Sequence, residues 1–129
     1  MPARGARAEP PGGLRWSAPE RELQRAHGPL LAAVDEVGRG PLAGPVVVCA
    51  IVMPPNAPEV AGVDDSKRLS AAARERAAAA VRAAAVAYGL GAASAREVDA
   101  LNVYRATVLA MRRGLTALGR RLAARGLGP

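Results

Sequence analysis

Two apolar segments joined by a short glycine-rich connection restrict the fold of this chain more than any other feature. Residues 30–37 and residues 45–53 each have the length of a strand, and the second segment is rich in β-branched side chains. Residues 38–44 between them contain three glycines and Pro41. A connection this short joins antiparallel neighbours, so these residues predict a β-hairpin. The nearly continuous apolar run of the second segment also predicts a strand that is buried on both faces.

Helical and extended segments alternate after the hairpin. Ser70 can cap a helix over residues 71–86, and residues 87–92 predict a third strand. A capping box then opens a helical stretch over residues 94–124, which we expect to break near Asn102. The order strand, strand, helix, strand, helix is an α/β arrangement, in which a further strand normally follows the last helix. We therefore expect a domain that is incomplete at its C-terminus.

The interior must be built from small aliphatic side chains. The chain has no Phe, and its aromatic residues are Trp16, Tyr88 and Tyr104. Ala, Val and Leu bury less area per residue than aromatic side chains, which leaves a narrow margin of stability. In the last helix an apolar face repeats at helical spacing and the basic residues lie off it. The apolar positions are Met111, Leu115, Leu118 and Leu122, and the basic positions are Arg112, Arg113, Arg120 and Arg121.

The first 28 residues differ in composition from the rest of the chain. Residues 1–28 predict a basic, Pro/Gly-rich flexible tail, in which a short helix over residues 18–26 can be capped by Ser17. Residues 29–129 predict a single domain. The net charge of +7 fits a polyanionic partner, because Lys and Arg neutralise phosphates. It fits equally well an arginine-rich, alanine-rich proteome, since Lys67 is the only lysine.

The single cysteine and the absence of long apolar runs indicate the compartment. Cys49 has no partner for a disulfide and lies in an apolar run, where a cysteine is more often a small buried side chain than a nucleophile. The basic N-terminus lacks the apolar core of a secretory signal, and no run is long enough to cross a bilayer. We expect a cytoplasmic monomer with no membrane association.

Two consecutive carboxylates, Asp35 and Glu36, close the first predicted strand. Carboxylates beside an apolar strand are costly unless they are solvated or bind a cation, and Mg²⁺ and Mn²⁺ prefer such oxygens. Both residues are therefore candidate metal ligands. Alternatively, they begin a loop and accept hydrogen bonds from turn amides. Adjacent strand residues point to opposite faces, so a shared metal site needs a bend at Gly38 or a Glu36 beyond the last strand pair.

A glycine motif and a polar loop are candidates for binding nucleic acid. Gly38 and Gly40 let a ligand approach the backbone, and Arg39 between them can contact a phosphate. The alternative is an ordinary turn with one exposed arginine. Ser66 and Lys67 precede a predicted helix, where a hydroxyl and an ammonium group can hold a phosphate; a solvated polar loop is the alternative.

Together these segments resemble the ribonuclease HII family, metal-dependent nucleases that cut the RNA strand of RNA–DNA hybrids. The similarity extends from about residue 31 to residue 118 and excludes the N-terminal tail. Its most specific part is the long motif that begins Val-Asp-Glu-Val-Gly-Arg-Gly. The matching segments are residues 34–47, 65–70, 97–102, 106–107 and 110–111. The resemblance implies that residues 29–129 are part of a ribonuclease-H-like catalytic domain, a mixed sheet flanked by helices.

The resemblance also implies a role for each candidate residue. Asp35 and Glu36 match the first catalytic metal ligands of the family. The segment Gly38–Gly40 matches the backbone motif that reads the ribonucleotide 2′-hydroxyl, the group by which a protein distinguishes RNA from DNA. Ser66 and Lys67 match a segment near the nucleic-acid backbone. The implied substrates are RNA–DNA hybrids or duplex DNA with embedded ribonucleotides, and the implied cofactors are two Mn²⁺ or Mg²⁺ ions that support phosphodiester hydrolysis.

The sequence departs from the family pattern in one respect. The pattern contains two further aspartates, the first on a strand after the long helix. Asp64, Asp65 and Asp99 match other positions of the family and do not replace them. We therefore expect that these 129 residues alone do not cleave. Two alternatives remain open, a non-catalytic nucleic-acid-binding remnant and an unrelated Mg²⁺-dependent phosphotransferase of similar fold.

Overall fold

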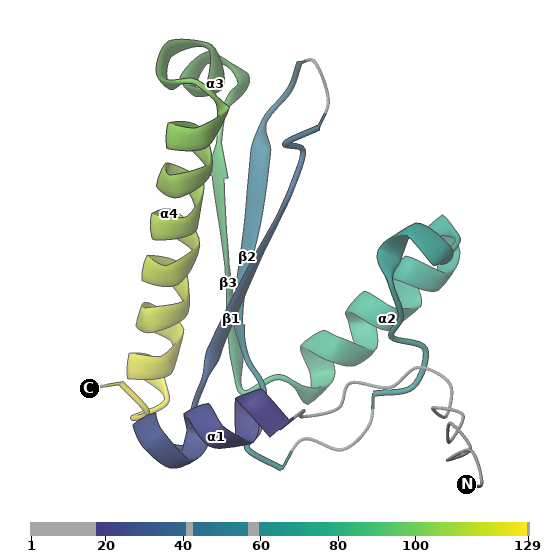
Figure 1. The fold of residues 1–129 in the computed structure, drawn as a ribbon, viewed down its shortest axis with the longest axis vertical. Coiled ribbons are helices and arrows are strands. Elements are labelled where there is room, and N and C mark those ends of the chain that lie inside the picture. Colours follow the sequence, from purple (N-terminus) through teal and green to yellow (C-terminus); the bar gives the residue numbers. More distant parts are fainter. Residues whose placement is uncertain (1–17, 41–42, 57–59, 129) are drawn as a thin grey trace, which may run out of the picture.

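A long helix lies along one face of a three-stranded sheet in the computed structural model, which describes residues 18–40, 43–56 and 60–128 (Figure 1). The elements confirm the α/β class that the sequence predicts. The strands are β1 (Ala32–Val37), β2 (Val46–Val52) and β3 (Ala87–Ala93). The helices are α1 (Ala18–His27), the 3-10 turn η1 (Ser66–Arg68), α2 (Ala71–Ala84), α3 (Ala95–Leu101) and α4 (Val103–Ala124).

The predicted hairpin is confirmed. Strands β1 and β2 pair antiparallel from Ala32 opposite Val52 to Val37 opposite Val47, and β3 pairs antiparallel with the other edge of β2. Gly38 starts the connection with φ +87°, and a Cβ there would collide with the carbonyl oxygen of Pro45. Only glycine fits this position, so the motif fixes the hairpin locally. Among the described residues, no strand pairs with the outer edge of β1.

Strand β2 is buried on one face only, which corrects the prediction that both faces are buried. Val46, Val48, Ala50 and Val52 are almost fully buried, whereas the residues between them are half-buried. The buried residues face α4, which contacts β2 and β3 extensively. No helix in the described part of the chain packs extensively on the opposite face, and α2 stands apart from the sheet (Figure 1). An apolar run therefore does not by itself identify a strand with two covered faces.

Helix α4 packs on β3 through glycines. A Cβ at Gly89 would lie 2.5 Å from the carbonyl oxygen of Gly114, and a Cβ at Gly91 would lie 2.9 Å from the carbonyl carbon of Arg113. The helix therefore approaches the strand more closely than any side chain would permit. This contact also explains why the buried face of α4 carries mostly small residues, namely Ala106, Thr107, Ala110, Gly114 and Leu118.

The predicted apolar face of α4 is correct only in part. Leu118 is buried, and Met111 and Leu122 are half-buried at the border of the core. Leu115, however, is 44% exposed. The face that contacts the sheet is rotated away from the leucines toward the small residues, because only small residues allow the glycine contact.

The arginines of α4 are exposed, as predicted, but two of them also bind the edge of the sheet. Arg113 donates to the carbonyl oxygen of Ala92 at 2.7 Å, and Arg121 donates to that of Tyr88 at 2.6 Å. Because β3 pairs only with β2 among the strands that the structure describes, these carbonyls lie at its other edge, which no described strand covers. Arg113 also forms an ion pair with Glu97 at 2.8 Å. The arginines therefore cover an edge that would otherwise be open.

The predicted helix caps are confirmed. Ser70 Oγ accepts a hydrogen bond from the amide of Ala73, and Ser94 and Glu97 form the reciprocal capping box. Asn102 separates α3 from α4 with φ +70° and caps α4 by accepting a hydrogen bond from the amide of Arg105. These features depend on residues that are close in sequence, which is why the sequence predicts them.

Helix α1 begins at Ala18, as predicted, and ends at His27; its predicted cap, Ser17, lies outside the described residues. The side-chain amide of Gln24 donates at 3.4 Å to the carbonyl oxygens of both Pro29 and Pro55. The boundary of the tail at residue 28 stays a prediction. Within the described ranges, no helix is long and apolar enough to cross a bilayer.

Candidate metal and nucleic-acid site

The two candidate metal ligands lie side by side on β1 but on opposite faces of the sheet. Asp35 pairs with Cys49 and Glu36 with Val48, and both pairs precede the last pair of the hairpin at Val37. Facing residues of paired strands share a face, so Glu36 points to the side of α4 and Asp35 to the open side. The carboxylate of Asp35 is exposed and accepts a hydrogen bond of 2.8 Å from the amide of Glu36.

The surroundings of the two carboxylates are apolar. Glu36 is half-buried and lies opposite Val48, which is completely buried. On the open face, Asp35 lies opposite Cys49, whose other strand neighbour Leu90 is 59% exposed. Burial raises the pKa of the Cys49 thiol, which agrees with its interpretation as a packing residue because the thiol form is a poor nucleophile.

A complete metal cage is not present in the described part of the chain. No group of three or more His, Cys, Asp or Glu residues there is arranged to hold a metal ion. Asp35 and Glu36 have the hard oxygen ligands that Mg²⁺ and Mn²⁺ prefer, but two carboxylates on opposite faces do not make a closed site. The assignment of both residues to one metal site stays a prediction, and it needs further ligands.

The two glycines of the motif differ in what the fold requires of them. Gly38 is required, because its backbone conformation and the neighbouring Pro45 exclude a side chain. Gly40 has no atom of a described residue within 4 Å of where a Cβ would lie, and its φ is not positive. The fold therefore does not explain a glycine at position 40. Arg39 between them is exposed.

Ser66 and Lys67 form part of η1 and are exposed. The carboxylate of Asp65 caps this turn by accepting a hydrogen bond of 3.0 Å from the amide of Lys67. Figure 1 shows that the segment leading into α2 stands apart from the strands. The structure therefore does not bring Ser66 and Lys67 next to the Gly38–Gly40 motif.

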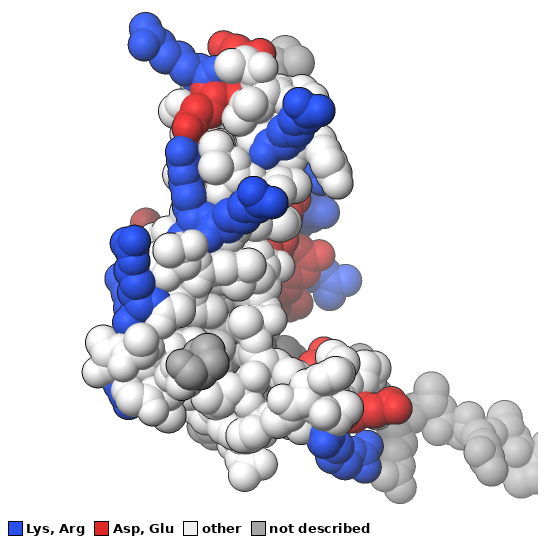
Figure 2. Space-filling view, turned by 90° about the vertical axis from the view of Figure 1, so that its left-hand side faces the viewer, with Lys and Arg blue, Asp and Glu red and all other residues white. Residues whose placement is uncertain are grey.

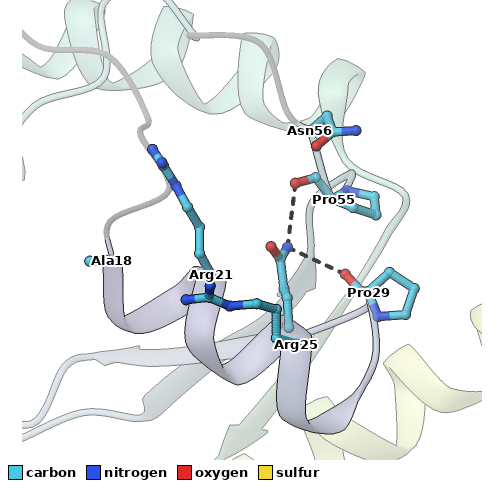
Figure 3. A pocket seen from close by; sticks show the side chains of 7 residues that line it. Ala18, Arg21, Arg25, Pro29, Pro55 and Asn56 are labelled. Atoms are coloured by element: carbon cyan, nitrogen blue, oxygen red, sulfur yellow. Dashed lines mark hydrogen bonds between the residues drawn. The ribbon is translucent and has the colours of Figure 1, made fainter.

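Two of the cavities lined by described residues lie away from the candidate site. The first, of about 550 Å³, is bounded by α1 and by the loop after β2, and its lining includes Arg21, Arg25 and Asn56 (Figure 3). The second, of about 360 Å³, is lined by residues of α2, β3 and α4. Neither lining includes a residue that the sequence predicts as part of the site. The basic residues of the second cavity come from α2 and from the end of α4, and no sequence motif joins them.

Basic side chains dominate the outer face of α4. Figure 2 shows arginines distributed along this face, with acidic side chains gathered near the end where α3 lies. Glu97 of α3 forms an ion pair with Arg113. The positive charge of this surface is complementary to the negative charge of a polyanion.

The comparisons with known proteins point to the same family that the sequence motifs resemble. A profile of the Ribonuclease HII family matches residues 32–124. A relative named Ribonuclease HII from Nitrosococcus oceani is 54% identical over 91 residues, which cover 70% of this chain and 45% of the relative. The Ribonuclease HII of Syntrophotalea carbinolica is 52% identical over 99 residues, covering 77% and 47%, and that of Halorhodospira halophila is 57% identical over 88 residues, covering 68% and 44%. The chain thus spans about half the length of the curated relatives it matches.

Proposed function

This chain belongs to the ribonuclease HII family, as its motifs predicted, and on that premise we propose that it carries the ribonucleotide-reading motif and the first metal ligands of an endonuclease. The proposed reaction is hydrolysis of the RNA strand of RNA–DNA hybrids, or of the phosphodiester at single ribonucleotides in duplex DNA. The observation that carries the proposal is Gly40, for which the described residues give no structural reason to be glycine, shortly after Asp35 and Glu36 at the end of β1. We propose that the protein acts in the cytoplasm as a monomer.

The metal ligands in this proposal are Asp35 and Glu36. Strand β1 is an outer strand of the described sheet, so side chains on both of its faces adjoin the same unpaired edge. A cation at that edge needs additional oxygen ligands, because the described residues supply no group of three. When bound, Mn²⁺ or Mg²⁺ supplies an activated water and stabilises the departing oxygen. The role of this chain is to hold two of the ligands at the end of a rigid strand.

The substrate contacts follow from the backbone after β1. At Gly40 nothing among the described residues blocks the approach of a sugar, so backbone groups there are accessible to a 2′-hydroxyl. The exposed guanidinium of Arg39 is available to a neighbouring phosphate. Ser66 and Lys67 are proposed to contact the nucleic-acid backbone farther away, where Lys67 adds a positive charge.

Binding measurements with the 129-residue chain test the recognition part of the proposal. Fluorescence anisotropy compares a DNA duplex that contains one ribonucleotide with the same duplex made only of DNA. We expect Gly40→Ala to abolish the preference for the ribonucleotide without changing the urea midpoint, because no described residue outside its chain neighbours lies within 4 Å of the added methyl group. Gly119→Ala is the matched control, since a methyl group there likewise meets no described residue outside the adjacent backbone, but Gly119 lies on α4. An unchanged preference in Gly40→Ala would contradict the assignment.

Metal binding and cleavage test the catalytic part. We expect Asp35→Asn to weaken binding of Mn²⁺, measured by calorimetry, by about tenfold or more, whereas Asp64→Asn has no effect. We also expect the 129-residue chain not to cleave the ribonucleotide-containing duplex in Mn²⁺. Ribonucleotide preference without Mn²⁺ binding would favour the alternative of a non-catalytic nucleic-acid-binding protein. Mn²⁺-dependent cleavage by this chain would show that two carboxylates are sufficient.

A further inference from the structure

Three arginines line one cavity at the C-terminal end of α4: Arg82 from α2, Arg121 from α4, and Arg125, which directly follows α4. The cavity has a volume of about 360 Å³, and its charged lining residues are Arg82, Arg121 and Arg125. The rest of the lining consists of Tyr88 and small aliphatic residues, with no carboxylate among the lining residues described. Ala87 and Tyr88 place it at the start of β3, the end of that strand opposite Ala92 and Ala93. It is therefore separate from the Gly38–Gly40 motif.

Two of the guanidinium groups are held in position before any ligand binds. Arg121 donates to the carbonyl oxygen of Tyr88 at 2.6 Å, and its guanidinium carbon lies 4.6 Å from the centre of the Tyr88 ring. Arg125 donates to the carbonyl oxygen of Val86. An arginine has five N–H donors, so each retains donors for a ligand. Because these side chains are already ordered, a ligand that binds them loses less conformational entropy.

The third arginine has no such anchor. Arg82 is exposed on α2 and makes no hydrogen bond or ion pair with another described residue. Its charge adds to those of Arg121 and Arg125 at the same cavity, where no acidic lining residue compensates them. Like charges repel when they share a site, and an anion between them removes that repulsion.

The helix ends offer a simpler explanation for these arginines, but it is not sufficient. Arg82 lies in the last turn of α2 and Arg121 in the last turn of α4, where a positive charge is favoured by the helix dipole. Each helix C-terminus carries about half a negative charge, so the two ends contribute roughly one negative charge in total. The three arginines that line the cavity exceed this, and a positive charge remains for a ligand.

We propose that the cavity lined by Arg82, Tyr88, Arg121 and Arg125 is a binding site for a phosphate group. Guanidinium groups bind phosphate oxygens through paired hydrogen bonds, and three arginines line the same cavity here. The phosphate belongs either to a small phosphorylated compound or to the backbone of a nucleic acid. The two sources share the same chemistry and are distinguished by their size.

The register of the sheet allows a bound duplex to reach the cavity. Val37 pairs with Val47, which pairs with Ala92, so the motif after Val37 lies near the level of Ala92 on β3. From Ala92 to Tyr88 the strand advances by about 13 Å at 3.3 Å per residue. Pyrophosphate is too small to reach from the cavity to the Gly38–Gly40 motif. A duplex of about 20 base pairs is long enough to contact both the cavity and the motif.

The test compares Arg82→Gln with Arg76→Gln. Both substitutions remove one positive charge from an exposed position of α2, but Arg76 does not line the cavity. Binding of pyrophosphate is measured by calorimetry, and binding of a 20-base-pair DNA duplex by anisotropy at the same ionic strength. We expect Arg82→Gln to weaken binding of at least one probe by about tenfold, and Arg76→Gln by less than about twofold.

Each outcome decides the proposal. If Arg82→Gln weakens the binding of pyrophosphate and Arg76→Gln does not, the site is assigned to a small phosphorylated compound. If Arg82→Gln weakens the binding of the duplex but not of pyrophosphate, and Arg76→Gln weakens neither, the site is assigned to a nucleic-acid backbone. If the two variants bind both probes equally, or if the unmodified chain binds neither, the cavity is not a phosphate site. Because Arg82 has no partner among the described residues, both variants should retain the urea midpoint of the unmodified chain.

Discussion

The contact between α4 and β3 leads to a quantitative prediction for Gly89→Ala. A Cβ at position 89 would lie 2.5 Å from the carbonyl oxygen of Gly114 and 2.9 Å from the carbonyl carbon of Ala117, and it would also collide with the amide nitrogen of Leu118. All three atoms belong to the backbone of α4, so a change of rotamer cannot relieve the clash. Ordinary contact begins at 3.4 Å. The helix must therefore move away from the sheet.

The size of that movement determines the energetic cost. A retreat of about 1 Å loses roughly a quarter to a half of the dispersion energy of each contact at the interface. The core clusters on both sides of Gly89 depend on this interface, because Ala110 and Leu118 of α4 pack there against β2 and β3. Overpacking typically costs about 1–3 kcal/mol. Since backbone meets backbone here, we expect a loss at the upper end, about 3 kcal/mol.

Urea unfolding followed by circular dichroism measures this loss. With a slope of about 2 kcal/mol per molar urea, Gly89→Ala lowers the midpoint by roughly 1.5 M. Gly119→Ala is the matched control on α4, because no described residue outside the adjacent backbone of its own helix has an atom within 4 Å of the added methyl group. This control should raise the midpoint by roughly 0.5 M, since alanine is favoured over glycine in a helix by about 1 kcal/mol. A midpoint for Gly89→Ala at or above that of the unmodified chain would refute the glycine-mediated packing.

Two further predictions concern the ends of α3. Hydrogen bonds from Arg113, and then from the amide of Ser94, lower the pKa of Glu97 from 4.5 to about 2. The stabilisation by Glu97 is therefore complete above pH 4.5 and is lost as the pH falls toward 2, so the thermal midpoint of the unmodified chain should approach that of Glu97→Gln over this range. The difference in thermal midpoint between the unmodified chain and the control Glu75→Gln should stay constant over this range. A constant difference for Glu97→Gln as well would contradict the stabilising role of the Glu97 carboxylate. At Asn102, φ +70° with ψ 163° is a conformation that only glycine adopts without strain, so Asn102→Gly should stabilise the chain by about 1 kcal/mol although the cap is lost. Asn102→Ala should destabilise it by about 1 kcal/mol, and equal urea midpoints for the two variants would show that the backbone there is not strained.

Features that depend on neighbouring residues were predictable from the sequence. The hairpin follows from Gly38 and its short connection, and the starts of α2 and α3 follow from Ser70 and from the capping box at Ser94. Asn102 also marked the break before α4 correctly. Each of these features rests on hydrogen bonds or backbone conformations within a few residues, which a sequence displays directly.

Features that depend on packing were decided by the tertiary structure. The apolar run of β2 did not reveal that only one of its faces is covered, because that depends on where α4 lies. The spacing of leucines on α4 predicted a buried Leu115, which is exposed, because the contact with Gly89 and Gly91 turns the small residues of the helix toward the sheet. Two glycines on a strand do not specify which helix will approach them.

The candidate site also has some features that the sequence predicts and others that the tertiary structure decides. The order Asp-Glu-Val-Gly-Arg-Gly identified the family and the residue types, since both are properties of consecutive residues. The sequence predicted that Asp35 and Glu36 point to opposite faces unless the strand bends or ends before Glu36, and only the register of β1 showed that both lie in regular strand pairs. Only the fold showed that the hairpin requires glycine at position 38, whereas no described neighbour requires it at position 40. The meeting of Arg82 with Arg121 and Arg125 was likewise decided by tertiary structure. The physical reason is that local sequence sets backbone conformation, whereas the packing of distant elements sets which side chains share a space.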